Sequence, residues 1–545
     1  MKKIFSLLIA LCATASLWAA RFQFGELYFN TISDTTVEVT SKSSSSPYNS
    51  GVTITNVSIP NMVTYNEKTY SVKRIGDNAF NECSSLVSIV IPEGVEKINK
   101  AAFNTCKKLT SVTLPNSLTS IGNYAFYGCS SLTQITVPEN VRSIASDAFS
   151  NSYLQQVVWN AKNYPDATYH SSSPFYGVYN RIKTFIIGDN VEHIPAYLCY
   201  CMSNLTSVTI GENVKTIGEY AFSSCSKLSS ISIPLNVNKM RGGVFAGCSS
   251  LSSLVWNPKE CVIDYKVTNT SSTYYPFADC PILSLTLGDS VYSIPANLFY
   301  YCDKITHVTL PKSVRSIGAC AFTACNGLTK TNYLGNIEDW CNIEFANYDS
   351  NPISQSNNFY INDIEVVDLI IPNSIDSIKN YSFWGCSTLK SIVFGRNVSY
   401  ISSSAFPGCS SIEYIVNKAI VPPTLNQAFP TKPLCYVPCG TLNAYFSSNW
   451  KEYCYQFIEQ SSVYDVTITL NNASYGQAKV SSRPDCESAI ITAIPNEGCT
   501  FVKWSDGNTQ ATRYLELAED ISLTAYFAKE GYTIHVYQDC NTTIE

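Results

Sequence analysis

The sequence has few charged residues and no concentration of positive charge. Asp, Glu, Lys and Arg make up 14% of its 545 residues, the formal net charge is −6, and no run of five or six Lys or Arg residues occurs. Proteins bind nucleic acids through basic patches that neutralise phosphates, so this composition argues against a nucleic-acid partner. Beyond the first twenty residues there is no run of about 18 apolar residues, so we expect no further membrane-spanning helix.

Histidine is scarce, and the common catalytic motifs are missing. His170, His193, His307 and His535 have neither a second histidine nor a paired carboxylate at a spacing that indicates catalysis or metal binding. The carboxylates are scattered, and there is no Gly-x-Ser-x-Gly elbow, Walker loop or dinucleotide fingerprint. We therefore predict a protein that is not an enzyme and that carries no cofactor and no metal.

A repeat of 23 residues runs through most of the chain. Phe80, Phe103, Phe126 and Phe149 are each 23 residues apart, and the same step separates Phe383, Phe406 and Phe429. About fourteen units fit between Phe80 and Phe429. A repeat of this length indicates a solenoid, in which each unit stacks on the next because it cannot bury its apolar face alone.

One unit contains a short strand and a turn. Val112-Thr113-Leu114 alternates between inward and outward side chains and precedes Pro115, whereas residues 123–127 lack this alternation and suit a helical turn. Units stacked at the strand spacing of about 4.8 Å would form one long parallel sheet. The predicted fold is therefore an α/β repeat solenoid of short parallel strands and short helical turns, with a small all-β cap before it and a β domain after it.

Eleven cysteines follow the repeated phenylalanine, or the residue equivalent to it, by three positions. We interpret them as a buried ladder of small apolar thiols, with Ser152 and Val178 at equivalent places. The alternative is a stack of disulfides between units, although the 21 cysteines that remain after Cys12 cannot all pair. The cysteines of this ladder are Cys83, Cys106, Cys129, Cys201, Cys225, Cys248, Cys280, Cys302, Cys325, Cys386 and Cys409.

Other cysteines lie outside this pattern. Cys435, Cys439 and Cys454 come close together near the end of the repeats, where a disulfide is one interpretation and separate thiols another. A metal site is disfavoured, because no histidine is near and the spacing matches no standard zinc pattern. The Cys199 and Cys201 pair is interpreted as structural.

The two ends of the chain differ from the repeats. Lys2-Lys3, the apolar run from Ile4 to Cys12 and the small residues up to Ala20 have the order of a secretory signal peptide, which predicts export to the cell surface or the medium. Alternating β patterns occupy the segment before the repeats and the one after Glu459. The predicted segments are a signal peptide 1–20, a β cap 21–74, a solenoid 75–460, a β domain 464–529 and the start of a further segment 530–545.

The repeats resemble a known family. Residues 217–225, Ile-Gly-Glu-Tyr-Ala-Phe-Ser-Ser-Cys, are similar to BspA-type leucine-rich repeats of bacterial surface proteins. The domain after them, with Ala-Ile-Pro-Asn-Glu-Gly at 493–498 followed by Phe501, Trp504 and Gly507, resembles B-repeat modules, although Cys499 replaces their usual aromatic residue. The first resemblance implies a surface adhesin that attaches to host matrix proteins or to other cells.

Two sets of residues are candidate contacts. Three stretches interrupt the repeat, Val157 to Pro174, Val255 to Pro276 and Asn332 to Asp368, and the first two contain aromatic residues in predicted loops. The second set lies on the outward face of the strands, which is nearly uncharged. The candidates are Trp159, Trp256, Tyr164, Tyr169, Tyr265, Tyr274 and Tyr275 in the loops, and Thr113, Thr136, Thr209 and Thr309 on the strands.

Each set has a purely structural alternative. The aromatic residues can fold back over the solenoid as local packing, and the threonines can be solvated strand residues. The predicted partner is a host matrix or cell-surface protein, or a surface glycan, bound by a monomer. Two other functions remain open, namely glycan capture for nutrient uptake and a spacer that presents another domain.

Overall fold

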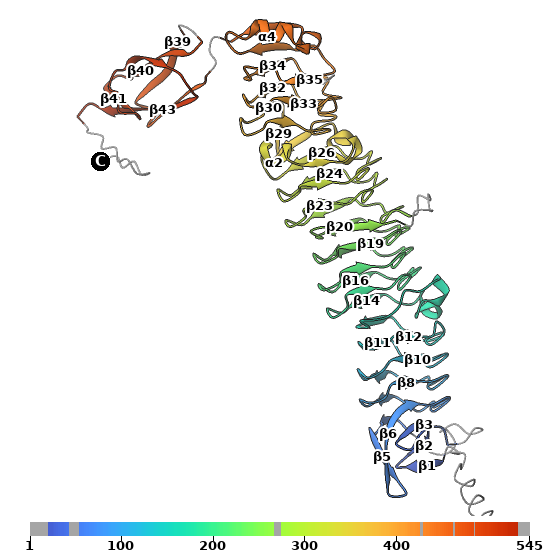
Figure 1. The fold of residues 1–545 in the computed structure, drawn as a ribbon. Coiled ribbons are helices and arrows are strands. Elements are labelled where there is room, and N and C mark those ends of the chain that lie inside the picture. The colour runs from blue at the N-terminus through green and yellow to red at the C-terminus, as the bar shows by residue number, and fades with distance from the viewer. Residues whose placement is uncertain are drawn as a thin grey trace, which may run out of the picture. The chain divides into compact units, whose positions relative to one another are not determined.

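The computed structural model describes residues 20–42, 54–265, 274–425, 429–460, 464–483 and 486–531 (Figure 1). The chain divides into two compact units. Unit 1 consists of Met1–Leu334 and Ile343–Ser356, and unit 2 of Gly335–Asn342 and Asn357–Glu545. The predicted signal peptide, apart from its last residue, and the predicted segment from residue 532 onward lie outside the described residues.

Unit 1 begins with a small group of longer strands. The hairpin of β5 and β6 and the antiparallel set β1, β2 and β3 join because β3 runs parallel to β6, and β6 then pairs with the first short strand of the repeats. Phe22, Phe29 and Val37 are buried beneath them. The strands are β1 (Arg21–Phe24), β2 (Leu27–Thr31), β3 (Thr36–Thr40), β5 (Met62–Tyr65) and β6 (Lys68–Ile75).

The rest of unit 1 is a stack of rungs, and most rungs contain two short strands rather than the one predicted. The first row is the predicted one, with Val112 paired to Ile89 at a separation of 23 residues. It consists of β4 (Asn56–Ser58), β7 (Ser88–Val90), β9 (Ser111–Thr113), β11 (Gln134–Val137), β13 (Gln156–Trp159), β14 (Thr184–Ile187), β16 (Ser207–Thr209), β18 (Ser230–Ile233), β20 (Ser253–Trp256), β22 (Ser284–Leu287), β24 (His307–Leu310) and β26 (Lys330–Tyr333).

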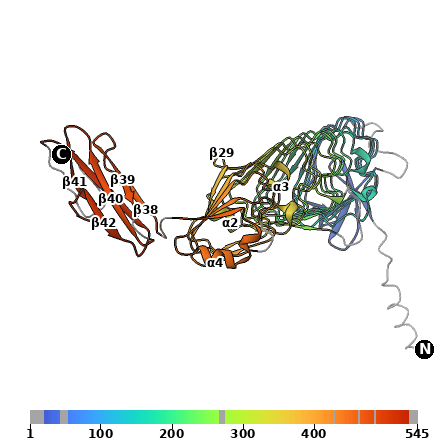
Figure 2. The ribbon, with the colours of Figure 1, turned by 90° about the horizontal axis from the view of Figure 1, so that it is seen from above.

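The second row follows Pro115 and its equivalents and keeps the same register, with Ile121 between Ile98 and Ile144. It consists of β8 (Lys97–Ile98), β10 (Ser120–Ile121), β12 (Ser143–Ile144), β15 (His193–Ile194), β17 (Thr216–Ile217), β19 (Lys239–Arg241), β21 (Val262–Asp264), β23 (Ser293–Ile294), β25 (Ser316–Ile317) and β27 (Glu344–Phe345). Viewed along the stack, successive rungs of unit 1 overlie one another (Figure 2).

The repeated phenylalanines form the core of the turns between the rows. The ring centroids of Phe103 and Phe126 are 5.1 Å apart and those of Phe126 and Phe149 are 5.3 Å apart, with nearly parallel planes. The predicted helical turns are single hydrogen-bonded turns, and their backbones also bond between rungs. The Phe103 amide donates to the Ala125 carbonyl at 2.8 Å, and the Thr105 amide to the Tyr127 carbonyl at 2.7 Å.

The cysteine ladder is present and has a polar function besides packing. Ten of its eleven predicted members are buried free thiols, as are the side chains of Ser152 and Val178 at equivalent places. The Cys106 thiol donates to the carbonyl of Phe80 at 3.0 Å, and the Cys129 thiol to that of Phe103 at 3.1 Å. Each thiol thus satisfies a buried carbonyl of the preceding rung, which a methyl group of similar size could not do.

The prediction for Cys201 is wrong. Cys201 is only half-buried and has a left-handed backbone with φ of 59°. In this rung Cys199 takes the place of the phenylalanine, since its amide donates to the Ala221 carbonyl at 2.7 Å, and Met202 takes the ladder position. The shift arises because the inserted segment before it changes the count of residues between Phe175 and Phe222.

The insertions add short helical elements. The first carries η1 (His170–Ser172) and η2 (Tyr176–Val178), and the third carries α2 (Ile337–Cys341), η4 (Tyr348–Ser350), α3 (Ile353–Ser356), β28 (Phe359–Ile361) and β29 (Ile364–Glu365). In α2, the Asn336 side chain accepts a hydrogen bond from the Asp339 amide and so caps the helix. Trp340 of this helix is buried and donates to the Ser382 carbonyl at 2.9 Å.

Unit 2 repeats the rung architecture and then closes it. One row contains β30 (Asp368–Ile370), β32 (Ser391–Phe394), β34 (Tyr414–Asn417), β36 (Leu434–Val437) and β37 (Gln456–Glu459), and the other contains β31 (Ser377–Ile378), β33 (Tyr400–Ile401) and β35 (Thr424–Leu425). Between β36 and β37 lie α4 (Leu442–Ser447) and η5 (Asn449–Glu452), which bury Tyr445 and Trp450. Cys435 and Cys454 form a disulfide here, which answers the question that the sequence left open.

The chain then forms two three-stranded sheets around a small core of its own. The sheets are β38-β43-β41 and β39-β40-β42, and the core contains Ile491, Trp504, Leu523 and Phe527. A second disulfide joins Cys439 of the closing segment to Cys486. The strands are β38 (Val466–Leu470), β39 (Gly476–Ser482), β40 (Ser488–Pro495), β41 (Cys499–Trp504), β42 (Thr512–Glu516) and β43 (Ile521–Lys529).

Phe126→Ala is expected to lower the free energy of unfolding by about 3–5 kcal/mol, because it removes a large ring from a closely packed stack. Chemical denaturation followed by circular dichroism measures this change. Thr113→Ala, on the exposed strand face, serves as the control and is expected to change stability by less than about 0.5 kcal/mol. A loss below about 1 kcal/mol for Phe126→Ala would contradict the stacked core.

Thiol labelling tests the ladder. Burial raises the pKa of Cys129 and of Cys325 to about 12, so these thiols hold almost no reactive thiolate at pH 8. Among the described free cysteines, we expect rapid alkylation of Cys201, Cys320 and Cys499, which are half-buried, and of the rest only in denaturant. Peptide mapping after a short pulse of iodoacetamide measures this pattern, and native labelling of Cys106 as fast as that of Cys320 would contradict it.

Candidate functional site

The two loop tryptophans are core residues. Trp159 ends β13 and Trp256 ends β20, and both are fully buried. Trp159 pairs with Val137 and Ile187 in the strand register, so its side chain continues the inward row of the sheet. The prediction that these rings are exposed in loops is wrong, because strand alternation extends one residue further than the loop boundary drawn from the sequence.

The predicted tyrosines separate into packed and accessible groups. Tyr164 is buried and its hydroxyl donates to the Ile144 carbonyl at 3.3 Å, which is the local packing considered as the alternative. Tyr274 is also buried, and Tyr265 is half-buried with its hydroxyl donating to the Ala296 carbonyl at 3.3 Å. Tyr169 is exposed, and Tyr275 lies half-buried at a surface hollow.

The four threonines lie on the outward side of the first strand row. Thr113, Thr136, Thr209 and Thr309 are all exposed, as the strand register predicts. The neighbours of Thr136 on the flanking strand are also uncharged, since it pairs with Val158. Their contact with a partner stays a prediction.

A row of aromatic rings crosses several turns of unit 1. Consecutive ring centroids in this tyrosine row are 4.2 to 6.1 Å apart, from the first insertion to the turn after the second. The row runs through Tyr179, Tyr176, His170, Tyr200, Tyr197, Tyr220, Tyr274, Tyr265, Tyr275, Tyr300 and Tyr301.

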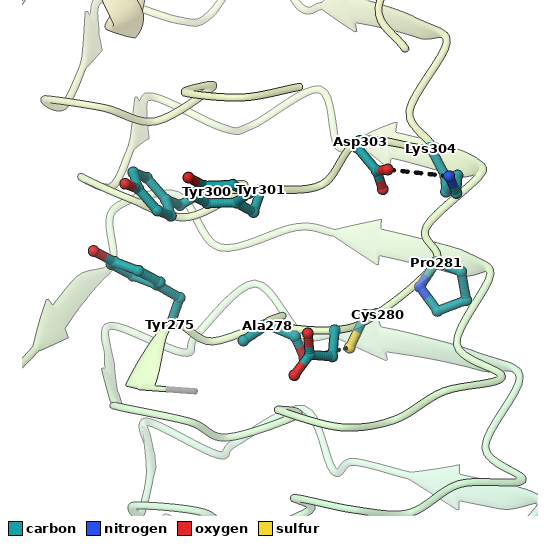
Figure 3. Close-up of a pocket in the computed structure, with 9 residues that line it drawn as sticks. Tyr275, Ala278, Cys280, Pro281, Tyr300, Tyr301, Asp303 and Lys304 are labelled. Atoms are coloured by element: carbon teal, nitrogen blue, oxygen red, sulfur yellow. Dashed lines mark hydrogen bonds and ion pairs between the residues drawn. The ribbon is translucent and has the colours of Figure 1, made fainter. Parts of the chain in front are cut away.

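Two adjoining hollows lie along this row and share Asp279. We name them together the tyrosine groove. The larger hollow has a volume of about 760 Å³, and its labelled aromatic side chains, Tyr275, Tyr300 and Tyr301, lie together on one side (Figure 3). The smaller has a volume of about 450 Å³. Tyr275, Ala278, Asp279, Cys280, Pro281, Tyr300, Tyr301, Asp303 and Lys304 line the larger hollow, and His170, Tyr197, Tyr200, Tyr220, Ser223, Ser224, Ala246, Gly247 and Asp279 line the smaller.

The phenol groups of the groove stay neutral. Partial burial, with the nearby Glu219 carboxylate, raises the pKa of Tyr220 to about 12 and also raises that of Tyr197. Burial likewise raises the pKa of Tyr300. Each hydroxyl therefore keeps its proton near neutral pH and can both donate and accept a hydrogen bond.

The formal charges in the groove are mostly negative. Asp279 is exposed between the two hollows, and Asp303 forms an ion pair with Lys304 at 3.0 Å. Within the part of the chain that the structure describes, no group of three His, Cys, Asp or Glu side chains is arranged to hold a metal ion. The groove therefore offers neutral rings, hydroxyls and a carboxylate, and its chemistry is that of recognition.

Only Tyr275 of the groove was among the residues that the sequence analysis selected. Tyr197, Tyr200, Tyr220, Tyr300 and Tyr301 belong to ordinary turns of the repeat and were missed. A signal was available, because Tyr197, Tyr220 and Tyr301 lie two residues before or after the position of the repeated phenylalanine. Side chains at those places leave the core on the same side of every rung.

The described residues contain no helix that is long and apolar enough to cross a membrane. Stacked rungs with a parallel strand row and a conserved inward pattern of Leu, Ile and Phe positions define a leucine-rich repeat protein. The chain belongs to the BspA-type leucine-rich repeat family, since the model described as BspA type leucine rich repeat region (6 copies) matches residues 43–173, 165–274, 259–352 and 353–477. The model of the divergent InlB B-repeat domain matches residues 466–531.

Several solved structures are similar to this chain. A leucine-rich repeat protein from Bacteroides ovatus is 21% identical, with 80% of this chain and 99% of that one covered and a TM-score of 0.33. A leucine rich cell surface protein from Faecalibacterium prausnitzii is 20% identical over 73% and 94% of the two chains, with a TM-score of 0.28. One from Bacteroides capillosus is 30% identical over 26% and 97%, with a TM-score of 0.23. No protein with a curated description matches.

A buried-edge carboxylate holds the inserted segment that carries His170. Asp166 accepts hydrogen bonds from the His193 ring and from the Ala196 amide, both at 2.8 Å. The hydrogen bond from His193 lowers the pKa of Asp166 below its usual value, partial burial opposes this, and the Ala196 amide adds to the lowering.

This contact predicts a loss of stability in acid. Because the folded pKa of Asp166 is lower than the unfolded one, its contribution is present above the ordinary carboxyl pKa of about 3.9 and disappears as the pH falls through the folded value. The melting temperature of Asp166→Asn is therefore expected to lie below that of the native chain at pH 6, with the difference closing below about pH 3. Thermal denaturation measures both, and a difference independent of pH would contradict the assignment.

Proposed function

We propose that this protein is exported and acts outside the bacterial cell as an adhesin-like attachment protein that binds host matrix proteins or other cells through its solenoid surface. The observation that supports the proposal is the tyrosine groove of unit 1. Family members are typically bacterial surface proteins, and the N-terminal sequence has the pattern of a signal peptide.

Tyrosine is suited to contact surfaces. Its ring covers a large area while only two side-chain torsions have to be fixed, and its hydroxyl can follow the polar groups of a partner. In the groove the rings are held by one another, since Tyr275 and Tyr300 lie 4.2 Å apart between centroids. Little side-chain entropy is therefore left to lose when a partner binds.

The scaffold beneath the groove is rigid. Turn backbones bond directly from one rung to the next, as the Gly247 amide does with the Ala278 carbonyl at 2.8 Å. A preorganised surface of this kind loses little free energy to reordering on binding. The exposed threonines of the first strand row are a second proposed contact, because they form an uncharged face on the same rungs.

Attachment is tested with the chain lacking its predicted signal peptide, applied to immobilised matrix proteins and to whole cells. We expect saturable binding, and the double variant Tyr275→Ala/Tyr300→Ala is expected to weaken it by about tenfold or more, as the loss of central aromatic contacts does. Tyr292→Ala is the matched control, because Tyr292 is an exposed tyrosine of unit 1 that does not line the groove.

Silence of the intact chain towards every matrix protein and cell type would contradict the proposed function and favour a spacer. Binding that the double variant leaves unchanged would retain attachment and place it elsewhere on the protein. Circular dichroism of each variant, compared with the native chain, separates a lost contact from a lost fold.

A further inference from the structure

We infer that the tyrosine groove is a binding site for an extended neutral glycan, one sugar unit for about each rung that it crosses. This inference rests on the proposed function and specifies what that function recognises. The chemistry of the lining side chains, the repeat distance along the groove, its charge and the state of the backbone beneath it each support a glycan over a peptide or an acidic polymer.

The side chains of the groove match the two faces of a sugar. Aromatic rings pack against the apolar C–H face of a pyranose, and neutral hydroxyls exchange hydrogen bonds with its equatorial oxygens. Tyr275, Tyr300 and Tyr301 lie on one side of the larger hollow, and the raised pKa values of Tyr220 and Tyr300 keep these hydroxyls protonated (Figure 3). Asp279 adds a carboxylate acceptor common to both hollows.

The repeat distance fits an extended chain of sugars. Backbone hydrogen bonds connect Cys201 to Ser223, Ser224 to Ala246 and Gly247 to Ala278, so the groove crosses consecutive rungs before it reaches Tyr301. Rungs spaced by about 4.8 Å extend the groove to roughly 19 Å. One rung is therefore close to the length of one pyranose in an extended glycan, and successive sugars meet equivalent positions.

Charge argues against acidic ligands. The groove contains the carboxylates of Asp279 and Asp303, and the ammonium group of Lys304 is paired with Asp303 at 3.0 Å. A sulfated or sialylated chain would bring its anions towards these carboxylates without an unpaired lysine or arginine among the lining residues to receive them. A neutral chain has no such penalty.

The backbone argues against a peptide strand. Extended peptides bind by adding to an unpaired sheet edge, where main-chain hydrogen bonds supply the affinity. In the groove the amides are already used between rungs, as those of Gly243 and Phe245 are with the Tyr274 and Pro276 carbonyls, both at 2.8 Å. Recognition must therefore come from side chains, which is the way sugars are bound.

The left-handed turns supply a variant that removes a ring without harming the fold. Tyr220 has φ of 53°, a conformation that tyrosine adopts with strain and asparagine adopts readily, and Asn78 and Asn297 have φ of 54° and 57° at the equivalent place. Tyr220→Asn is thus expected to keep or raise the melting temperature while it removes an aromatic face from the groove.

The test uses the chain without its signal peptide and titrates it calorimetrically with linear hexasaccharides. The neutral probes are cello-, chito-, laminari- and malto-hexaose, and a heparin hexasaccharide is the acidic one. We expect at least one neutral probe to bind, with affinity about tenfold weaker in Tyr275→Ala/Tyr300→Ala and also weaker in Tyr220→Asn. The control Tyr292→Ala is expected to bind as the native chain does.

Three results would overturn the inference, namely no binding of any neutral probe, tighter binding of the heparin probe than of every neutral one, or binding that the groove variants do not change. The attachment assay repeated with enzymatically deglycosylated matrix protein separates this inference from the proposed function. Attachment that persists and still depends on the groove would reject the glycan and keep the adhesin. Groove-dependent glycan binding without attachment to any cell or matrix would reject the adhesin and keep the glycan site.

Discussion

Hydrogen bonding between the backbones of successive rungs is the interaction on which the rest of this structure depends. A single unit of 23 residues cannot bury its apolar stripe, and it becomes stable only when the strands and turns on both sides pair with it. Pairing at a fixed step brings Phe103, Phe126 and Phe149 into one stack of nearly parallel rings. Hydrophobic burial then follows from the register that the backbone sets.

The same register explains the cysteine ladder. A residue three places after each phenylalanine faces the carbonyl group of the phenylalanine one rung earlier, which is buried and has to be satisfied. Cysteine is small enough for this place and still offers a weak donor, so a thiol serves both packing and hydrogen bonding. In the closing segment, where stacking ends, the cysteines instead form the Cys435–Cys454 disulfide.

Turn geometry also decides where recognition can take place. Residues two before and two after the phenylalanine position adopt left-handed backbones, as Tyr220 and Gly247 do, and their side chains leave the core. Stacking then aligns these side chains across rungs, so tyrosines that are distant in sequence become a row. Because the backbone under the row is fully engaged between rungs, the row is a rigid surface of rings, hydroxyls and little charge.

The sequence by itself determined the repeat step, the inward Phe, Leu and Ile positions, most of the cysteine ladder and the outward threonines, because these follow from a local period. It misplaced Cys201 and the rings of Trp159 and Trp256, since an insertion changes the count and strand alternation continues past an apparent boundary. It also missed all of the tyrosine groove except Tyr275. Tyr200, Tyr220 and Tyr300 become neighbours of one groove only through stacking, and no local pattern records which turns the two insertions bring together.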